Sequence, residues 1–184
     1  MFIQKKKYYL FIENTRDFNL NLIKIRNKIN IIYRNKNTTD KIQDLLNFRN
    51  NCKKRGVNFF VANDKKLLSK LNADGLYISA HNVNLLLSIF SKSKYKIIGS
   101  AHNQKEVDIK IKQGCKTIIY SRLFRTRYDY KKGYLGVIKF NIISHRLKLN
   151  LVPLGGINEK NLCKLNSVVS NSFACLSVIK KKPA

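Results

Sequence analysis

The chain has no tryptophan, one methionine and two prolines among its 184 residues, whereas lysine, asparagine and isoleucine are abundant. A genome rich in A and T produces the same bias through codon usage, so these absences by themselves identify no function. Cysteine is also sparse, and Cys52, Cys115, Cys163 and Cys175 are widely spaced with no CxxC pair. This spacing indicates neither a zinc site nor a redox motif, and we expect reduced, mostly buried thiols.

Long apolar runs are missing too. None approaches the roughly 20 residues that a membrane-spanning helix needs. The run from Tyr8 to Ile12 is too short for the core of a signal peptide, and polar residues follow it at once. Because the apolar fraction of 44% excludes a disordered chain, we expect a folded, cytoplasmic protein that makes no membrane contact.

Acidic residues are scarce: 10 Asp and Glu stand against 37 Lys and Arg, which gives a net charge of +27. A charge of this size ordinarily points to nucleic acid. The basic residues are spread over the whole chain rather than gathered in an arm, so we favour a solvated basic surface and expect no nucleic-acid partner. A basic RNA-binding module stays as an alternative, and anionic ligands are favoured in either case.

Short apolar runs alternate with helix-like stretches along the whole sequence, a pattern typical of repeated βα units around a parallel sheet. The eight candidate strands are residues 8–12, 29–33, 58–62, 75–78, 96–99, 117–120, 151–154 and 173–178. Eight strands with intervening helices predict a compact (β/α)8 TIM barrel, an α/β fold, as a single domain over residues 1–184.

Helices are expected at residues 40–55, 82–90, 103–114, 135–148 and 159–168. Gly56 and Gly114 lie where C-terminal capping glycines belong, and Glu106 follows Asn103 at the spacing of a capping-box variant. Barrels typically need about 200 or more residues, so these helices must be short. Only residues 179–184 follow the last predicted strand, so we expect the final helix to be short or missing. One side of the barrel would then be open to a partner subunit, such as a second copy in a homodimer.

Active sites of such barrels are built from the residues that follow the strands. Arg34 and Lys36 follow the second strand at alternate positions, so both can point to one side and hold a polyanion, or both can be ordinary surface cations. Asp64 follows the third strand, where its carboxylate suits Mg²⁺. It equally suits an N-cap for a helix starting at Lys65.

Histidines and a long basic loop complete the polar residues. His81 and His102 are interpreted as hydrogen-bonded loop residues and His145 as a surface residue. In the loop of residues 121–134, Arg and Lys interleave with Phe and Tyr. That mixture suits a phosphorylated heteroaromatic ligand, and it would equally suit single-stranded RNA.

Gly155 and Gly156 join a short apolar run to a helix-like stretch. Because glycine has no Cβ, the backbone of this turn can approach a phosphate held at a helix N-terminus. The alternative is that the two glycines form an ordinary turn.

Six strand-end motifs, in order along nearly the whole chain, resemble those of the thiamine phosphate synthase and TenI family of (β/α)8 barrels. They are Tyr33-Arg34-Asn35-Lys36, Asn63-Asp64-Lys65, Asn72-Ala73-Asp74-Gly75-Leu76-Tyr77, Ile97-Ile98-Gly99-Ser100-Ala101-His102, Phe124-Arg125-Thr126 and Leu154-Gly155-Gly156-Ile157. Each motif is short, but six of them at the spacing of a barrel are fairly specific.

The resemblance implies a transferase of thiamine biosynthesis that joins an aminopyrimidine pyrophosphate to a thiazole phosphate and releases pyrophosphate, assisted by Mg²⁺. It implies pyrophosphate binding and catalysis by Arg34, Lys36, Asn63 and Ser100. It implies thiazole phosphate binding by Thr126, Gly155, Gly156 and Ser177. The metal ligand would be Asp64, with Asn82 as a weaker second ligand.

The sequence departs from the family pattern at three positions. Asn82 stands where the family ordinarily has a second metal-binding aspartate, Ile32 stands in place of a glutamine, and Ser121-Arg122 replaces Gly-Pro. The TenI branch has its catalytic histidine at the position of Arg122. Arginine stays protonated and cannot act as that base, so the TenI aromatase role is disfavoured. The alternative to a synthase is a catalytically degenerate, TenI-like phosphate-binding barrel with an accessory or regulatory role in thiamine metabolism.

Overall fold

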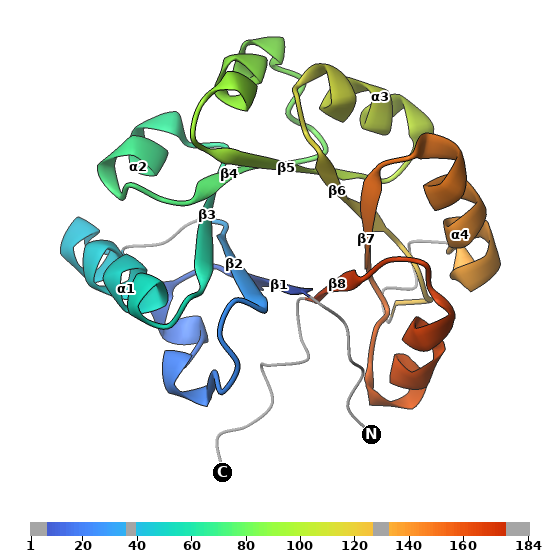
Figure 1. Ribbon diagram of the computed structural model, residues 1–184, viewed down its shortest axis with the longest axis horizontal. Helices are drawn as coiled ribbons and strands as arrows, with labels where there is room; N and C mark the ends of the chain where they lie inside the picture. Colours follow the sequence, from blue (N-terminus) through green and yellow to red (C-terminus); the bar gives the residue numbers. More distant parts are fainter. Residues whose placement is uncertain (1–6, 36–39, 127–132, 176–184) are drawn as a thin grey trace.

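The computed structural model describes residues 7–35, 40–126 and 133–175. Within these residues eight parallel strands form a closed barrel in which each strand pairs with the next and β8 closes on β1 (Figure 1). The strands are β1 (Lys7–Ile12), β2 (Ile29–Tyr33), β3 (Asn58–Ala62), β4 (Gly75–Ile78), β5 (Lys96–Ala101), β6 (Thr117–Ser121), β7 (Asn150–Leu154) and β8 (Ser172–Cys175). The predicted TIM barrel is confirmed. The end of the eighth predicted strand and the missing final helix concern residues outside the described ones.

Helices and 3₁₀ segments lie around most of the outer face of the barrel (Figure 1). The α-helices are α1 (Ile42–Lys54), α2 (Lys65–Lys70), α3 (Gln104–Lys112) and α4 (Gly136–Leu147). Short 3₁₀ segments are η1 (Thr15–Asp17), η2 (Leu20–Leu22), η3 (Leu85–Lys92) and η4 (Glu159–Ser167). Gly56 and Gly114 follow α1 and α3 with left-handed φ values of 66° and 81°, as the sequence predicts for C-terminal caps.

Two predicted helices are wrong in type, because residues 82–90 and 159–168 contain the 3₁₀ segments η3 and η4 instead. Both segments start after an asparagine whose side chain accepts a hydrogen bond from the backbone two residues on, Asn84 from Leu86 and Asn158 from Lys160. Asn158 also caps the N–H of Asn161, three residues on, just as Asn103 caps the N–H of Glu106 before the regular helix α3, so the cap does not decide between the two helix types.

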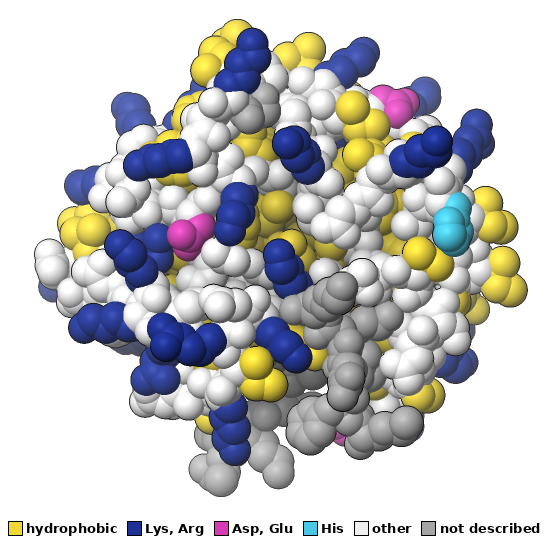
Figure 2. All heavy atoms as spheres, viewed as in Figure 1, with side chains coloured by type: hydrophobic (Ala, Val, Ile, Leu, Met, Phe, Trp, Pro, Cys, Tyr) yellow, Lys and Arg dark blue, Asp and Glu magenta, His cyan; other side chains and the backbone are white. Residues whose placement is uncertain are grey.

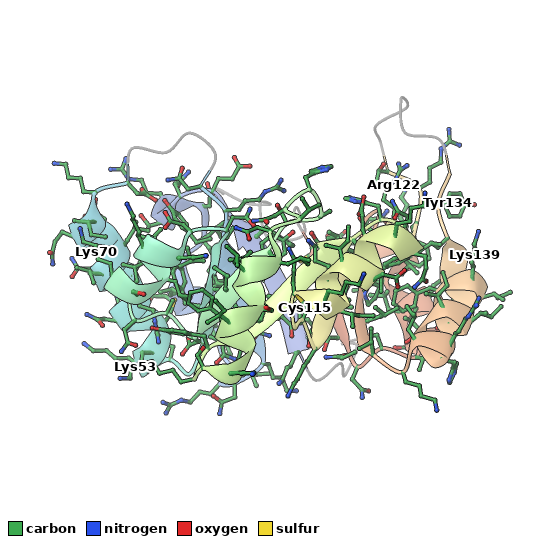
Figure 3. The ribbon with its side chains drawn as sticks, turned by 90° about the horizontal axis from the view of Figure 1, so that it is seen from above. Lys53, Lys70, Cys115, Arg122, Tyr134 and Lys139 are labelled. Atoms are coloured by element: carbon green, nitrogen blue, oxygen red, sulfur yellow. The ribbon has the colours of Figure 1, made fainter. Side chains whose placement is uncertain are left out.

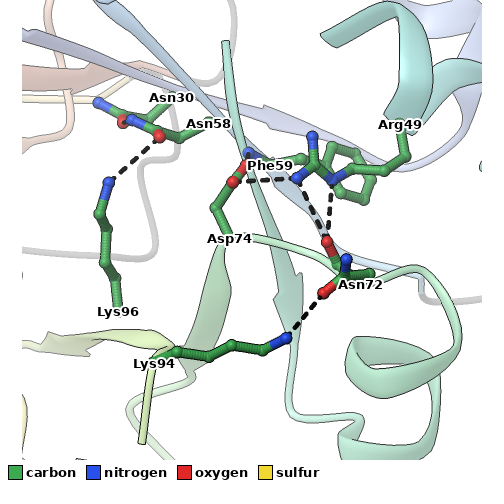
Figure 4. Close-up of polar contacts among 8 residues, drawn as sticks. All are labelled: Asn30, Arg49, Asn58, Phe59, Asn72, Asp74, Lys94 and Lys96. Atoms are coloured by element: carbon green, nitrogen blue, oxygen red, sulfur yellow. Dashed lines mark hydrogen bonds and ion pairs between the residues drawn. The ribbon is translucent and has the colours of Figure 1, made fainter. Parts of the chain in front are cut away.

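Strand alternation divides the core into two layers. Inside the barrel pack Tyr9, Phe11, Ile32, Phe60, Tyr77, Ile98, Ile119, Val152 and Ala174. A larger cluster fills the space between the outer face of the strands and the helices. The amino-terminal end of the barrel is polar: Lys96 donates to Asn58 over 3.2 Å, and Asn58 donates to Asn30 over 2.8 Å (Figure 4). This hydrogen-bonded chain spans β2, β3 and β5 at the end opposite the candidate site.

The cysteines are free thiols, of which Cys52, Cys115 and Cys175 are buried and Cys163 is exposed, so the prediction of mostly buried thiols is confirmed. Burial raises the pKa of Cys52 and of Cys115 to about 12, which keeps both protonated at neutral pH. In the described part of the chain, no helix is long and apolar enough to cross a membrane.

Candidate active site

The candidate site lies at the carboxyl ends of the barrel strands. Figure 3 shows Arg122 and Tyr134 at the upper rim of the molecule, whereas Lys53 at the end of α1 lies toward the lower rim. The face drawn in Figure 2 carries Lys and Arg side chains in every sector and few carboxylates, in agreement with their even spread along the sequence. A site in this molecule therefore lies within a generally positive surface.

Arg34 continues the inward-facing positions of β2, after Asn30 and Ile32, and lies at the mouth of the barrel. Its backbone N–H donates to the carbonyl of Ile12 over 2.9 Å, which extends the pairing of β1 with β2. The Arg34 side chain is half-buried.

Tyr77 and Ser100 lie in the same region. The Tyr77 hydroxyl donates to Ser100 Oγ over 2.8 Å, and both side chains are buried. Burial raises the pKa of Tyr77, while the hydrogen bond to Ser100 and the charge of Arg34 act in the opposite direction. Because Ile32 and Ile98 point into the barrel, Arg34 and Ser100, each two positions further on and predicted to bind pyrophosphate, share that inward face at the carboxyl end of the strands.

Asn63 joins the loops after β3 and β4. Its backbone has a left-handed φ of 58°, which asparagine tolerates better than most residues. Its side-chain nitrogen donates to Ser79 Oγ over 3.0 Å, and its oxygen accepts from the Ser79 N–H and from Asn82 Nδ2, each over 3.1 Å. Both halves of the amide therefore have a structural role, and pyrophosphate binding by Asn63 stays a prediction.

Asp64 is the N-cap of α2, because its Oδ1 accepts the N–H of Leu67 over 2.9 Å. Its exposed carboxylate also borders a pocket of about 300 Å³ that Tyr33 and Asn35 help to line. Mg²⁺ usually keeps several waters and needs only one or two protein carboxylates. Asp64 fits such an ion. Asn82 fits less well, because its side-chain oxygen already accepts the N–H of Asn84 over 3.0 Å.

A buried lysine holds the loop that carries Asn82. Lys110 Nζ donates to the Asn82 carbonyl over 2.6 Å and to Gln113 Oε1 over 2.8 Å. Gln113 in turn donates to the carbonyls of Asn82 and Asn84 over 2.9 and 3.0 Å. A Cβ at Gly99 would lie 2.9 Å from the Lys110 side chain, so the glycine of the fourth motif makes room for this lysine. The buried position of Lys110 was not predicted from the sequence, where the glycine at position 99 was the one hint that a large side chain packs there.

Replacing Lys110 with methionine is expected to change how stability depends on pH. Burial lowers the pKa of Lys110 below its ordinary 10.5, while Cys115 and Glu106 nearby act in the opposite direction. Between the lowered pKa and 10.5 the unfolded chain holds a proton that the folded chain does not, so the wild-type free energy of unfolding gains a term that rises with pH. Urea unfolding of both proteins at several pH values from 7 to 10.5 should show that the wild-type free energy of unfolding rises with pH relative to that of Lys110→Met. Parallel profiles would contradict this account.

Thr126, Gly155 and Gly156 meet where the loops after β6 and β7 touch. Thr126 Oγ1 accepts a hydrogen bond from Arg122 Nη1 over 3.0 Å. A Cβ at Gly155 would lie 3.0 Å from Arg122 Cγ, and one at Gly156 would lie 2.4 Å from the carbonyl oxygen of Phe124. The two glycines therefore allow the loops to approach closely. Lys36 and Ser177, the other predicted anion-binding residues, lie outside the described part of the chain.

The helix-like stretch after the glycines is capped by its own side chains. Asn158 Oδ1 accepts the N–H of Lys160 over 2.9 Å, and the Asn158 N–H donates to Asn161 Oδ1 over 2.9 Å. These contacts occupy donors at the start of η4 that a phosphate at a helix N-terminus would use. The start of η4 therefore offers a phosphate fewer donors, and phosphate binding at the turn of Gly155 and Gly156 stays a prediction.

His102 is a hydrogen-bonded loop residue, as predicted. Its Nδ1 lies 2.9 Å from Glu106 Oε2, and its backbone N–H donates to the same oxygen over 2.7 Å. Burial raises the pKa of Glu106, but the hydrogen bonds from His102 and Asn103 outweigh burial, and the pKa falls below its ordinary value. His81 lies in the loop after β4 and stacks on His102 with ring centroids 6.1 Å apart, while its predicted hydrogen bond stays a prediction. His145 is exposed on α4, as expected.

With this geometry established, comparison with known proteins assigns the chain to a family. Residues 6–179 match the thiamine monophosphate synthase family. The chain belongs to this family. A thiamine-phosphate synthase of Prochlorococcus marinus subsp. pastoris is 27% identical over 142 residues, which cover 77% of this chain and 40% of that protein. One of Methanosarcina barkeri is 26% identical over 150 residues, 79% of this chain and 66% of that protein.

The fold agrees with solved structures. A thiamine phosphate pyrophosphorylase from Pyrococcus furiosus superimposes with a TM-score of 0.70 at 17% identity, over 96% of this chain and 88% of that chain. At this identity the likeness supports the barrel alone. The chain also spans less than half of the length of the Prochlorococcus relative.

In this member of the thiamine monophosphate synthase family, Asp74 and Gly75 of the third motif are structural rather than part of the site. Asp74 Oδ1 pairs with Arg49 over 3.0 Å, and Asp74 Oδ2 accepts the N–H of Phe59 over 2.7 Å, which ties α1 to β3 (Figure 4). A Cβ at Gly75 would lie 2.1 Å from the carbonyl oxygen of Lys96. Asp74 and Gly75 lie at the amino-terminal end of the barrel and serve packing, whereas Tyr77 of the same motif contacts Ser100 in the candidate site.

Proposed function

We propose that the protein is a thiamine phosphate synthase, a transferase that joins an aminopyrimidine pyrophosphate to a thiazole phosphate and releases pyrophosphate. The observation that carries the proposal is the arrangement of Arg34 with Tyr77 and Ser100 at the barrel mouth, in a member of this family. A cation beside buried hydroxyls suits a leaving pyrophosphate. The names of the relatives support the same reaction.

The proposed reaction breaks the bond between the pyrimidine methylene carbon and the pyrophosphate oxygen, and the bonding electrons leave with pyrophosphate. The lone pair of the thiazole nitrogen then forms the new C–N bond. The protein has to neutralise the leaving group and align the nucleophile, for which fixed cations and donors suffice. Arg34 and Ser100 would contact the pyrophosphate, and the β6–β7 turn would hold the thiazole phosphate.

Magnesium is part of the proposal. Asp64 would hold Mg²⁺ through one carboxylate oxygen, with Asn82 as the weaker candidate. When bound there, the ion would supply further neutralisation of the pyrophosphate charge. The cytoplasmic location and the homodimer expected from the sequence also stay predictions.

The direct test is to incubate the purified protein with aminopyrimidine pyrophosphate, thiazole phosphate and Mg²⁺. We expect thiamine phosphate and pyrophosphate to form in equal amounts, and neither to form without the thiazole substrate. Calorimetric titration with each substrate alone, in parallel, separates failure to bind from failure to react. Binding of both substrates without product above background would overturn the synthase proposal.

The second candidate is a barrel that binds thiamine precursors without joining them. Asn82 favours it, because a neutral amide holds Mg²⁺ less strongly than the aspartate of the family and its oxygen already accepts a backbone hydrogen bond. Substrate binding without turnover in the same assay is the result that this candidate predicts.

A further inference from the structure

Arg122 has a fixed backbone position at the neck of the long loop after β6. The N–H of Leu135, just before α4, donates to the Arg122 carbonyl over 2.9 Å. The next residue, Leu123, donates to the Leu154 carbonyl over 2.9 Å and so extends the pairing of β6 with β7. The two ends of the loop therefore hold Arg122 in place beside the turn that follows β7.

The Arg122 side chain lies over Gly155. Its Cγ, Cβ and Cα would lie 3.0, 3.2 and 3.3 Å from a Cβ at that position, so the absence of a side chain at Gly155 makes room for the arginine. The glycine motif that the family resemblance assigns to phosphate binding here also accommodates a cation.

The guanidinium lies at Thr126, a predicted phosphate-binding residue. Arg122 Nη1 donates to Thr126 Oγ1 over 3.0 Å, while the first atoms of the same side chain lie over Gly155. Arg122 is half-buried, so its charge is only partly screened by water. A planar guanidinium matches phosphate oxygens in a bidentate fashion, which neither a hydroxyl nor a backbone amide can do alone.

We propose that Arg122 is a specificity-determining residue that binds the phosphate of the thiazole substrate and makes the site select the phosphorylated ligand over its unphosphorylated alcohol. The inference rests on the proposed function for the identity of the ligand. It goes beyond that function, because the family pattern has Gly-Pro at Ser121-Arg122 and supplies no cation there. In this chain, a charge contributed from β6 adds to the neutral contacts of Thr126 and the turn.

The test measures dissociation constants by titration calorimetry for thiazole phosphate and for the corresponding thiazole alcohol. Replacing Arg122 with methionine should weaken thiazole phosphate binding roughly 10–100-fold, because a charge-assisted contact is lost. Affinity for the alcohol should change less than about twofold, and Arg122→Lys should restore part of the selectivity.

Arg125→Met is the matched control, because it removes the same charge from the same loop at an exposed side chain. It should leave the ratio of the two affinities within about threefold of wild type. Thermal unfolding of each variant shows whether the fold persists. An Arg122→Met protein that is folded and binds thiazole phosphate as tightly as wild type, or more tightly, would overturn the inference. An equal loss of affinity for thiazole phosphate and for the alcohol would also overturn it.

The readout separates this inference from the proposed function because it needs no turnover. The wild-type protein could select thiazole phosphate over the alcohol through Arg122 and yet make no thiamine phosphate. That result would overturn the synthase proposal alone. Full synthase activity with selectivity unchanged in Arg122→Met would overturn the specificity role alone.

Discussion

Replacing Gly156 with aspartate is expected to abolish thiazole phosphate binding and to lower synthase activity by at least about 100-fold. A Cβ at Gly156 would lie 2.4 Å from the carbonyl oxygens of Phe124 and Arg125, so the β6 loop would have to move. The position also has a φ of +69°, which side-chain-bearing residues adopt at a cost. The new carboxylate would repel the substrate phosphate as well. Calorimetry and product assay measure the two effects.

Gly155→Ala and Gly156→Ala form a matched pair that isolates the steric part of this prediction. Both positions have positive φ, so each substitution carries a backbone cost of about 1–2 kcal/mol. At Gly155 the new methyl group would lie 3.0–3.3 Å from Arg122, a tight contact, whereas at Gly156 it would lie 2.4 Å from backbone carbonyl oxygens, a much more severe overlap. We expect Gly156→Ala to lower the free energy of unfolding more than Gly155→Ala does. Equal losses would show that the contact between the β6 and β7 loops relaxes freely.

The strands could be predicted closely because each is a short apolar run between polar or glycine-rich segments. The run at residues 58–62 is a strand at both predicted limits. The α or 3₁₀ character of the helices could not be predicted in this way. Asn84, Asn103 and Asn158 are all N-caps with the same side chain, and both Asn103 and Asn158 cap the N–H three residues on, yet only Asn103 starts an α-helix. The helix type therefore follows from tertiary packing and not from local propensity.

In the predicted site, too, some features could be predicted from the sequence and others could not. Strand-end position located Thr126 and the two glycines, and the structure brings them together. The partners of these residues depend on the register between strands, which single-strand patterns do not reveal. Arg122 was read as a departure from the family, yet its contact with Thr126 places it among the predicted phosphate ligands. Lys110 was one basic residue among 37, and its buried position follows only from the packing of α3 on β5.

Replacing Arg34 with methionine is expected to lower kcat/KM of the synthase reaction roughly 10²–10³-fold. Arg34 follows β2 on the same inward face as Tyr77 and Ser100, at the mouth of the barrel, where the pyrophosphate would develop its charge as it leaves. Methionine keeps much of the apolar stem of the side chain but removes the guanidinium. Steady-state kinetics with varied aminopyrimidine pyrophosphate, at saturating thiazole phosphate and Mg²⁺, measure the loss.

Arg26→Met is the control for charge alone, because Arg26 is exposed, precedes the same strand, and donates to the Lys54 carbonyl over 3.1 Å at the opposite end of the barrel. If general surface charge attracted the anionic substrates, both variants would lose activity to a similar degree, and more so at low salt. If Arg34 stabilises the leaving pyrophosphate, only Arg34→Met loses activity, and the loss persists at physiological ionic strength. Comparable losses of activity in the two variants would therefore show that the positive surface of the whole molecule, and not Arg34 in particular, promotes the reaction.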